Sequence, residues 1–219
     1  MGRRGPKPKG KVNTAWRPEL AYAVGLITAD GSLSKDMRHI DFTSKDIDQL
    51  ETYKSCLGIS DIKIGSKISG GLHKGVYYRV QFGDVLFYKW LLEIGLSPNK
   101  SNIIKKVCVP DKYFFDFIRG EWDGDGTISC SKDKRWKNSF VVSIAFASGS
   151  TDFLLWLQKE INTRLHTTGH VQKSVRASQL RYARKDSRTL FDAMFYKDDL
   201  PHLSRKFTKA QKIFKMTGL

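Results

Sequence analysis

The sequence has little cysteine and no long hydrophobic segment. Its three cysteines, Cys56, Cys108 and Cys130, lie far apart and form no CxxC pair, so neither a zinc site nor a disulfide framework is expected. No apolar run approaches the length of about 18 residues that a membrane span requires, and no signal-peptide pattern opens the chain. These absences predict a soluble intracellular protein in a reducing compartment, without distinguishing the cytoplasm from an organelle matrix.

Acidic residues are scarce relative to basic ones. Lysine and arginine outnumber aspartate and glutamate by 38 to 22, which gives a formal net charge of +16. Such an excess favours a polyanionic partner, and nucleic acid is the commonest large polyanion in a cell. A membrane-surface role would require a basic amphipathic helix, and the sequence shows no convincing one. Charge alone does not separate DNA from RNA.

The chain begins with a basic segment that cannot pack. Residues 1–17 hold six basic side chains and no acid, and they include the string GRRGPKPKG from Gly2 to Gly10. We predict a flexible arm over residues 1–17, with Arg3 and Arg4 binding DNA as do arms that lie in an AT-rich minor groove. A solubilising or processing tail is an equally good interpretation of this composition.

The chain contains an internal repeat. The string AVGLITADGSL resembles FIRGEWDGDGTI 95 positions later, and two looser matches follow in the same order along the chain. The aligned pairs are Gly25 with Gly120, Asp30 with Asp125, Arg79 with Arg181, and Lys100 with Lys206. Three ordered matches indicate a duplication. We therefore predict two related halves, residues 18–110 and 111–219, after the N-terminal arm.

Hydrophobic periodicity predicts the same order of elements, α-β-β-α-β-β-α, in each half. In the first half we expect helices at 19–30, 47–57 and 85–94, with hairpins over 32–44 and 62–82. In the second half we expect helices at 111–125, 151–164 and 187–196, strands near 127–131, 139–147, 168–176 and 178–184, and a basic terminal helix at about 203–216. This order predicts an α+β fold with antiparallel sheets that carry helices on one face.

The predicted strands place long polar side chains opposite their apolar residues. These side chains are Lys63, Lys67, Tyr77, Arg79 and Gln81 in the first half, and His170, Gln172, Arg176, Gln179 and Arg181 in the second. Donors and amides that alternate along a β-ribbon suit the reading of base edges and the binding of phosphates in a DNA major groove. The alternative is the ordinary solvent-facing side of an antiparallel sheet.

The two matching helix ends carry the chemistry. Small residues, Gly25 and Ala29 in one helix and Gly120 and Gly124 in the other, would let the helices pack closely on a pseudo-twofold axis. Asp30 and Asp125 would then lie side by side, which is unfavourable unless a cation separates them. Oxygen ligands and two helix C-termini favour Mg²⁺ there, with backbone near Ala29 and Gly124 as further ligands. Taken singly, either string is more typical of an ordinary helix-ending turn.

These helices resemble the paired signature helices of LAGLIDADG homing endonucleases in their monomeric, two-motif form. The first motif, Ala23 to Gly31, departs from the family pattern at Thr28, and the second, Ile118 to Gly126, departs at Glu121 and Trp122. The resemblance implies that Asp30 and Asp125 bind the metal. It also implies that Lys100 and Lys206 lie near the scissile phosphates.

The resemblance further implies an activity. Such enzymes read long, non-palindromic sites in double-stranded DNA with two saddle-like sheets, and they cut both strands across the minor groove to leave short 3′ overhangs. A monomer that uses Mg²⁺ is expected; Mn²⁺ should substitute, and Ca²⁺ should support binding without efficient cleavage. Two alternatives use the same fold: an intron maturase that binds RNA, and a DNA-binding regulator that does not cleave.

Overall fold

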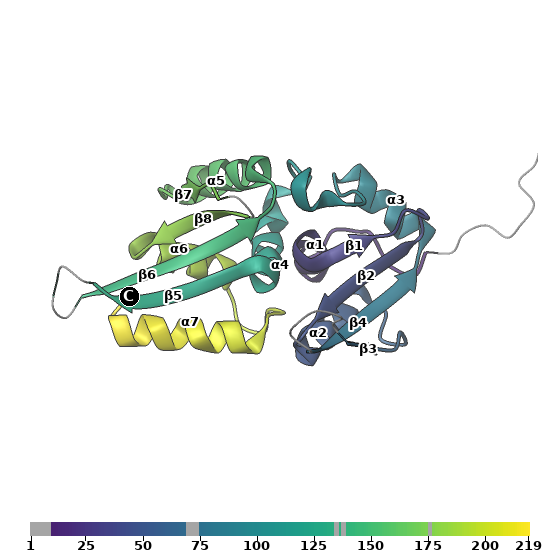
Figure 1. Cartoon of the computed structure of the whole chain (residues 1–219), viewed down its shortest axis with the longest axis horizontal. Helices are drawn as coiled ribbons and strands as arrows, with labels where there is room; N and C mark the ends of the chain where they lie inside the picture. Colours follow the sequence, from purple (N-terminus) through teal and green to yellow (C-terminus); the bar gives the residue numbers. More distant parts are fainter. Residues whose placement is uncertain (1–9, 69–74, 134–135, 137–138, 175–176) are drawn as a thin grey trace, which may run out of the picture.

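The computed structural model describes residues 10–68, 75–133, 136, 139–174 and 177–219. Two units of sheet and helices lie side by side along the long axis (Figure 1). Between them, α1 (Pro18–Asp30) packs against α4 (Phe114–Asp125). The predicted α+β fold with two central motif helices is confirmed. Arg3, Arg4 and Arg176, which the sequence analysis assigned to DNA binding, lie outside the described residues.

The first unit has a four-stranded antiparallel sheet in the order β1-β2-β4-β3. Its elements after α1 are β1 (Gly31–Leu33), β2 (His39–Ser44), α2 (Ile47–Leu57), β3 (Gly65–Ile68), β4 (Val76–Gly83), α3 (Val85–Glu93) and the short 3-10 helix η1 (Lys100–Asn102). Helix α2 ends as predicted, because Gly58 adopts the left-handed conformation that glycine favours (φ 69°). Strand β3 begins beyond Lys63, so the prediction that this residue lies on the strand is wrong.

The second unit repeats this arrangement with the strand order β5-β6-β8-β7. Its elements are a 3-10 turn η2 (Asp111–Tyr113) leading into α4, then β5 (Gly126–Lys132), β6 (Phe140–Ser148), α5 (Thr151–Leu165), β7 (His170–Gln172), β8 (Ser178–Ala183), α6 (Lys185–Met194) and α7 (Ser204–Thr217). Strand β7 is shorter than predicted. Within the described ranges, no helix is long and apolar enough to cross a bilayer.

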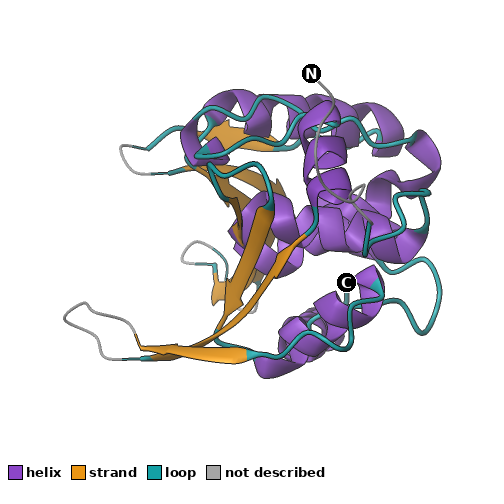
Figure 2. Cartoon of the chain, turned by 90° about the vertical axis from the view of Figure 1, so that its right-hand side faces the viewer, coloured by secondary structure: helices purple, strands orange, loops and turns teal. Residues whose placement is uncertain are grey.

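The helices cover one side of the two sheets and leave the other side open (Figure 2). Alternation along the strands explains this arrangement, since Val80 and Phe82 of β4 are buried whereas Gln81 between them is exposed. The same alternation holds in β8, where Leu180 and Tyr182 are buried and Arg181 is exposed. Helices on one face of each sheet, as predicted, leave the polar side chains on the opposite face.

The strand registers correct one part of the repeat alignment. Equivalent ladders run from Gly31 to Phe42 to Val80 in the first sheet, and from Gly126 to Phe146 to Leu180 in the second. The counterpart of Arg79 is therefore Gln179, and Arg181 corresponds to Gln81. The sequence match aligned the two arginines because the order of arginine and glutamine is reversed between the halves.

Candidate active site at the motif helices

Helices α1 and α4 are in backbone contact at their glycines. A Cβ atom added at Gly25 would lie 2.2 Å from the carbonyl oxygen of Phe117, and one added at Gly120 would lie 2.0 Å from that of Tyr22. No side chain fits at either distance. The predicted close approach at the small residues is present, and it requires glycine at both positions.

This contact brings the C-terminal ends of the two helices together. A Cβ added at Gly124 would lie 2.3 Å from the Cβ of Ala29 and 3.4 Å from Oδ2 of Asp30, so the end of α4 lies directly against the end of α1. Asp30 is the last residue of α1 and Asp125 is the last residue of α4. The topology therefore places both motif aspartates at one point on the pseudo-twofold axis.

The charge of one aspartate makes ionisation of the other less favourable. Burial, followed by the charge of Asp125, raises the pKa of Asp30 to about 6. Burial also raises the pKa of Asp125, and the ammonium groups of Lys206 and Lys100 oppose the shift at both carboxyls. The site thus concentrates negative charge that the protein offsets only in part.

The two predicted lysines lie at these helix ends, where they bind backbone carbonyls. Nζ of Lys206 donates to the carbonyl oxygens of Trp122 at 2.7 Å, Gly124 at 3.0 Å and Gly126 at 2.6 Å. Nζ of Lys100 donates to the carbonyl oxygen of Gly31, the counterpart of Gly126. Burial lowers the pKa of Lys206 to about 8 and also lowers that of Lys100. The carbonyl of Gly124, expected near a metal, is thus already engaged.

A third carboxyl group, Glu121, lies beside this site. Its side chain is buried, and Oε2 has no hydrogen-bond partner among the described residues. Burial, then the charge of Asp125, raises the pKa of Glu121 well above its usual range. It lines a cavity of about 50 Å³ with Asp125 and Thr28. In the sequence, Glu121 is visible only as a departure from the motif, and the leucine at the matching position, Leu26, is the signal that a buried side chain is expected here.

Replacing Glu121 with leucine is expected to stabilise the protein. The change removes an unpartnered buried carboxyl and should raise the free energy of unfolding by about 1–3 kcal/mol near pH 8. Because the folded-state pKa of Glu121 is raised, wild type loses stability as pH rises from the usual glutamate range through that pKa. The gain from Glu121→Leu should therefore grow with pH in urea titrations at pH 5, 6.5 and 8. Glu121→Gln, which cannot ionise, should lack that pH dependence, and a loss of stability in Glu121→Leu would show that Glu121 makes a favourable contact.

Asp123, two residues before the motif aspartate, has a structural role. Its Oδ2 accepts hydrogen bonds from the hydroxyl of Tyr22 at 2.9 Å and from the backbone N–H of Leu203 at 2.7 Å. The side-chain amide of Gln49 donates to its backbone carbonyl at 3.0 Å. Asp123 thereby joins α4 to α1, to α2 and to the segment that precedes α7.

Comparison with known proteins identifies the arrangement. No family model and no curated protein matches the sequence. Among solved structures, the homing endonuclease I-WcaI bound to its DNA recognition sequence aligns with a TM-score of 0.64 at 15% identity, covering 90% of this chain and 88% of its own. The I-LtrWI LAGLIDADG homing endonuclease bound to target DNA aligns with a TM-score of 0.59 at 13% identity, covering 92% and 91%. This chain has the LAGLIDADG fold.

Another structure with similarity to this LAGLIDADG fold is full-length DUF199/WhiA from Thermatoga maritima. It aligns with a TM-score of 0.56 at 13% identity and covers 90% of this chain and 63% of its own. At such identities the likeness establishes the arrangement of elements, while the chemistry depends on the residues of this chain.

In the first sheet of the LAGLIDADG fold, the predicted DNA-binding residues Tyr77, Arg79 and Gln81 alternate along β4 with the buried Val80 and Phe82. Arg79 donates to Oε1 of Gln81 at 3.3 Å and forms an ion pair with Asp41 of the neighbouring strand at 3.4 Å. Tyr77, two residues before Arg79, lies under the ammonium group of Lys45, 5.1 Å from its ring centre. Lys67 pairs with Tyr77 in the strand ladder. Asp41 adds an acidic side chain to this face.

The second sheet presents a similar set of side chains, with arginine and glutamine in the reverse order along the strand. Arg181 donates to Oε1 of Gln179 through Nε at 3.1 Å and through Nη2 at 2.7 Å. His170 pairs with Arg181 and Gln172 pairs with Gln179 in the ladder between β7 and β8, and both β7 side chains are exposed. Four of the predicted side chains therefore gather on adjacent strands of this LAGLIDADG sheet.

Proposed function

We propose that this protein is a site-specific endonuclease that hydrolyses one phosphodiester on each strand of a DNA duplex. The observation that carries the proposal is the meeting of two aspartates, Asp30 and Asp125, at the solvent-exposed ends of two helices in backbone contact. Two equivalent carboxyls on a pseudo-twofold axis match two scissile phosphates related by the approximate twofold symmetry of a duplex. Open sheet faces on both sides of the axis, a net charge of +16, and neighbours bound to DNA support DNA as substrate.

The carboxyl pair fits a divalent cation. Asp30 and Asp125 would hold it, because a cation would offset both the desolvation of Asp30 and the charge of Asp125, which together raise the pKa of Asp30. Their oxygen atoms suit Mg²⁺, with Mn²⁺ as a substitute. In the described part of the chain, no group of three or more His, Cys, Asp or Glu side chains is placed to hold a metal, so water and phosphate oxygens would complete the ligand set. When bound, such an ion polarises a phosphate and lowers the pKa of water.

The lysines have a separate role in this proposal. Lys100 and Lys206 hold the carbonyl oxygens at the ends of the motif helices, which fixes where the aspartates lie. Their positive charges oppose the raised pKa of both aspartates. We infer that they stabilise the charge that develops on the phosphate without contacting the metal.

The two sheets define the expected DNA site. Each open face would read about 10 base pairs, so a monomer would bind a non-palindromic site of about two helical turns. Arg79 and Gln81 occur in the opposite order to Gln179 and Arg181, which supports different base preferences in the two half-sites. Cleavage would occur across the minor groove between them and leave short 3′ overhangs, and Arg3 and Arg4 would extend the contact.

Metal dependence tests this proposal. Purified protein incubated with a randomised duplex library should yield doubly cut products in Mg²⁺ or Mn²⁺ and none in EDTA, with binding but little cutting in Ca²⁺. Undiminished cleavage in EDTA would exclude the two-aspartate mechanism. Duplex binding without cleavage in any metal would instead favour a regulator with the same fold. Selective binding of structured intron RNA would favour a maturase.

A further inference from the structure

Helix α7 has no counterpart in the first unit. Lys206 lies in its first turn, whereas the matching Lys100 is the first residue of the 3-10 helix η1, from which a linker leads to α4. Figure 1 shows α7 running beside β5, the strand at one end of the second sheet. Because β5 pairs only with β6, its other edge is left open beside α7.

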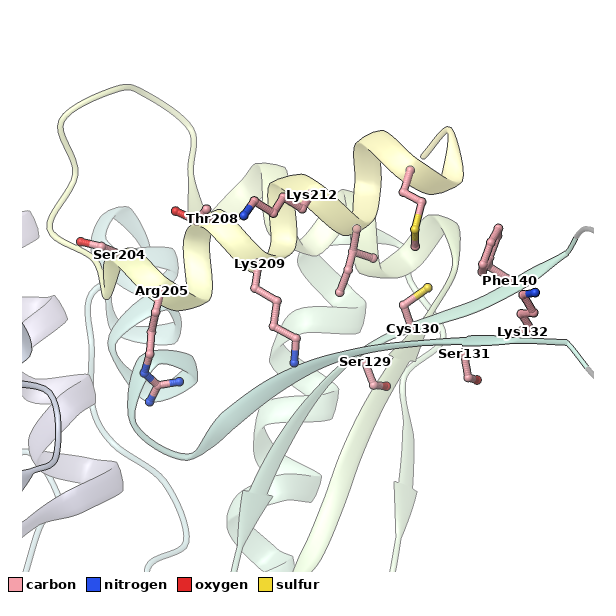
Figure 3. A pocket seen from close by; sticks show the side chains of 12 residues that line it. Ser129, Cys130, Ser131, Lys132, Phe140, Ser204, Arg205, Thr208, Lys209 and Lys212 are labelled. Carbon is pink, nitrogen blue, oxygen red and sulfur yellow. The ribbon is translucent and has the colours of Figure 1, made fainter. Parts of the chain in front are cut away.

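A groove of about 1020 Å³ lies between α7 and this open edge. Its lining includes four cationic side chains and no carboxylate. The cations are Lys132 of β5 and Arg205, Lys209 and Lys212 of α7. Ser129 and Ser131 of β5 also line the groove, with side chains that point away from α7 (Figure 3). Cationic side chains are groups that bind the sugar-phosphate backbone of nucleic acids.

The α7 cations lie on one side of the helix for a structural reason. Ala210, Ile213 and Phe214 are buried in the core and fix the rotation of α7. Lys209 and Lys212 are exposed, and in Figure 3 the side chain of Lys209 extends from α7 towards β5. Within the described ranges, neither lysine forms an ion pair. Arg205 differs, because it binds Asp46 at 2.8 Å.

On the open sheet face, the described residues of β5 and β6 include no cation. The residues of β5 and β6 on the open face are small, as Thr127, Ser129, Ser143 and Ala145 show. The long donors Gln179 and Arg181 lie beyond them on β8. Apart from Lys132 at the end of β5, the cationic groups that line this edge therefore come from α7.

We propose that the groove between α7 and β5 binds the sugar-phosphate backbone of the duplex at the outer part of the second half-site. This inference rests on the proposed function, since the DNA must lie across the open sheet faces. A helix of 14 residues is about 21 Å long, which matches about six phosphates of one strand at about 3.4 Å along the axis. Phosphate contacts carry no sequence information, so the groove adds affinity that is independent of base sequence.

The test is a double variant, Lys209→Ala with Lys212→Ala, measured on a 40-base-pair duplex of random sequence over a range of salt concentrations. The control, Lys215→Ala with Lys159→Ala, removes the same charge from exposed lysines that do not line the groove. The groove variant should bind at least about fivefold more weakly, and the slope of log affinity against log salt should fall by about 1.8, as for two lost phosphate contacts. Cleavage at saturating protein should keep its wild-type rate.

The other possible outcomes separate a failure of this inference from a failure of the proposed function. Equal losses in the groove variant and the control would reduce the effect to net charge and overturn the inference. An unchanged groove variant, with wild type still binding the duplex, would do the same while leaving the proposed function intact. Loss of binding to single-stranded RNA alone would assign the groove to RNA instead. Failure of the wild-type protein to bind any duplex would contradict the proposed function itself.

Discussion

Asp30→Asn and Asp125→Asn should each abolish double-strand cleavage while leaving DNA binding near the wild-type level. Asparagine keeps the size of the side chain but removes one negative charge from the pair that would hold the cation. A loss on the order of 100-fold or more in rate is expected, with nicked product at most, as when one group that stabilises developing charge is removed. Binding should hold or tighten slightly, because one fewer carboxylate faces the phosphates. The measurement compares supercoiled, nicked and linear plasmid over time, beside a binding titration in Ca²⁺.

A matched control separates the site from a general charge effect. Asp152→Asn makes the same substitution at an exposed position in the first turn of α5 and should cut at the wild-type rate. Lys100→Ala and Lys206→Ala should be milder than either aspartate variant, since neither lysine would hold the metal. If Asp30→Asn cuts both strands at the normal rate, Asp30 only ends a helix and the proposed active site is wrong.

The pH dependence of cleavage should follow from the same pair of aspartates, Asp30 and Asp125. The pKa of Asp30 is raised to about 6, so below that pH Asp30 is protonated in the metal-free protein. A cation then competes with a proton, and the Mg²⁺ concentration required for half-maximal cleavage should rise as pH falls from 7 to 5. A Mg²⁺ requirement that stays constant over this range would contradict a raised pKa at Asp30.

The parts of this structure that the sequence predicted well are those governed by local pattern. The bounds of α1 and α2 follow from apolar spacing and from Gly31 and Gly58, which lie just beyond the helix ends. The contact between the motif helices followed from a pair of glycines at equivalent positions, because only close backbone approach explains glycine inside two helices. Because each aspartate ends one of these helices, the contact also predicted that the two aspartates lie side by side.

The parts that were missed depend on tertiary packing. Equivalence across the repeat is set by strand registers, and sequence similarity aligned Arg79 with the wrong residue. The family resemblance implied that the lysines lie near the scissile phosphates, but their bonds to the carbonyls of Gly31 and Gly126 depend on how the segments before them fold back. The ion pair between Arg205 and Asp46, 159 positions apart, has no local signal at all.

Gly25→Leu and Gly120→Leu should have the largest effect on stability. Even a single added Cβ would lie 2.2 Å or less from backbone oxygen of the facing helix, and backbone cannot yield as a flexible side chain can. Leucine at either position must separate α1 from α4 and is expected to prevent stable folding. Alanine should destabilise by about 3 kcal/mol, at the upper end of the range for overpacked cores, and should leave enough folded protein for a urea titration.

Gly65→Ala provides the matched comparison for this prediction. An added Cβ at Gly65 meets its nearest atom, the carbonyl oxygen of Arg79, at an ordinary 3.8 Å, so alanine there should be close to neutral. Cleavage by the folded fraction of Gly25→Ala should also fall, because any shift between the helices moves Asp30 relative to Asp125. If Gly25→Ala and Gly65→Ala unfold at the same urea concentration, the helices do not depend on backbone contact. The pairing of the two aspartates would then need another explanation.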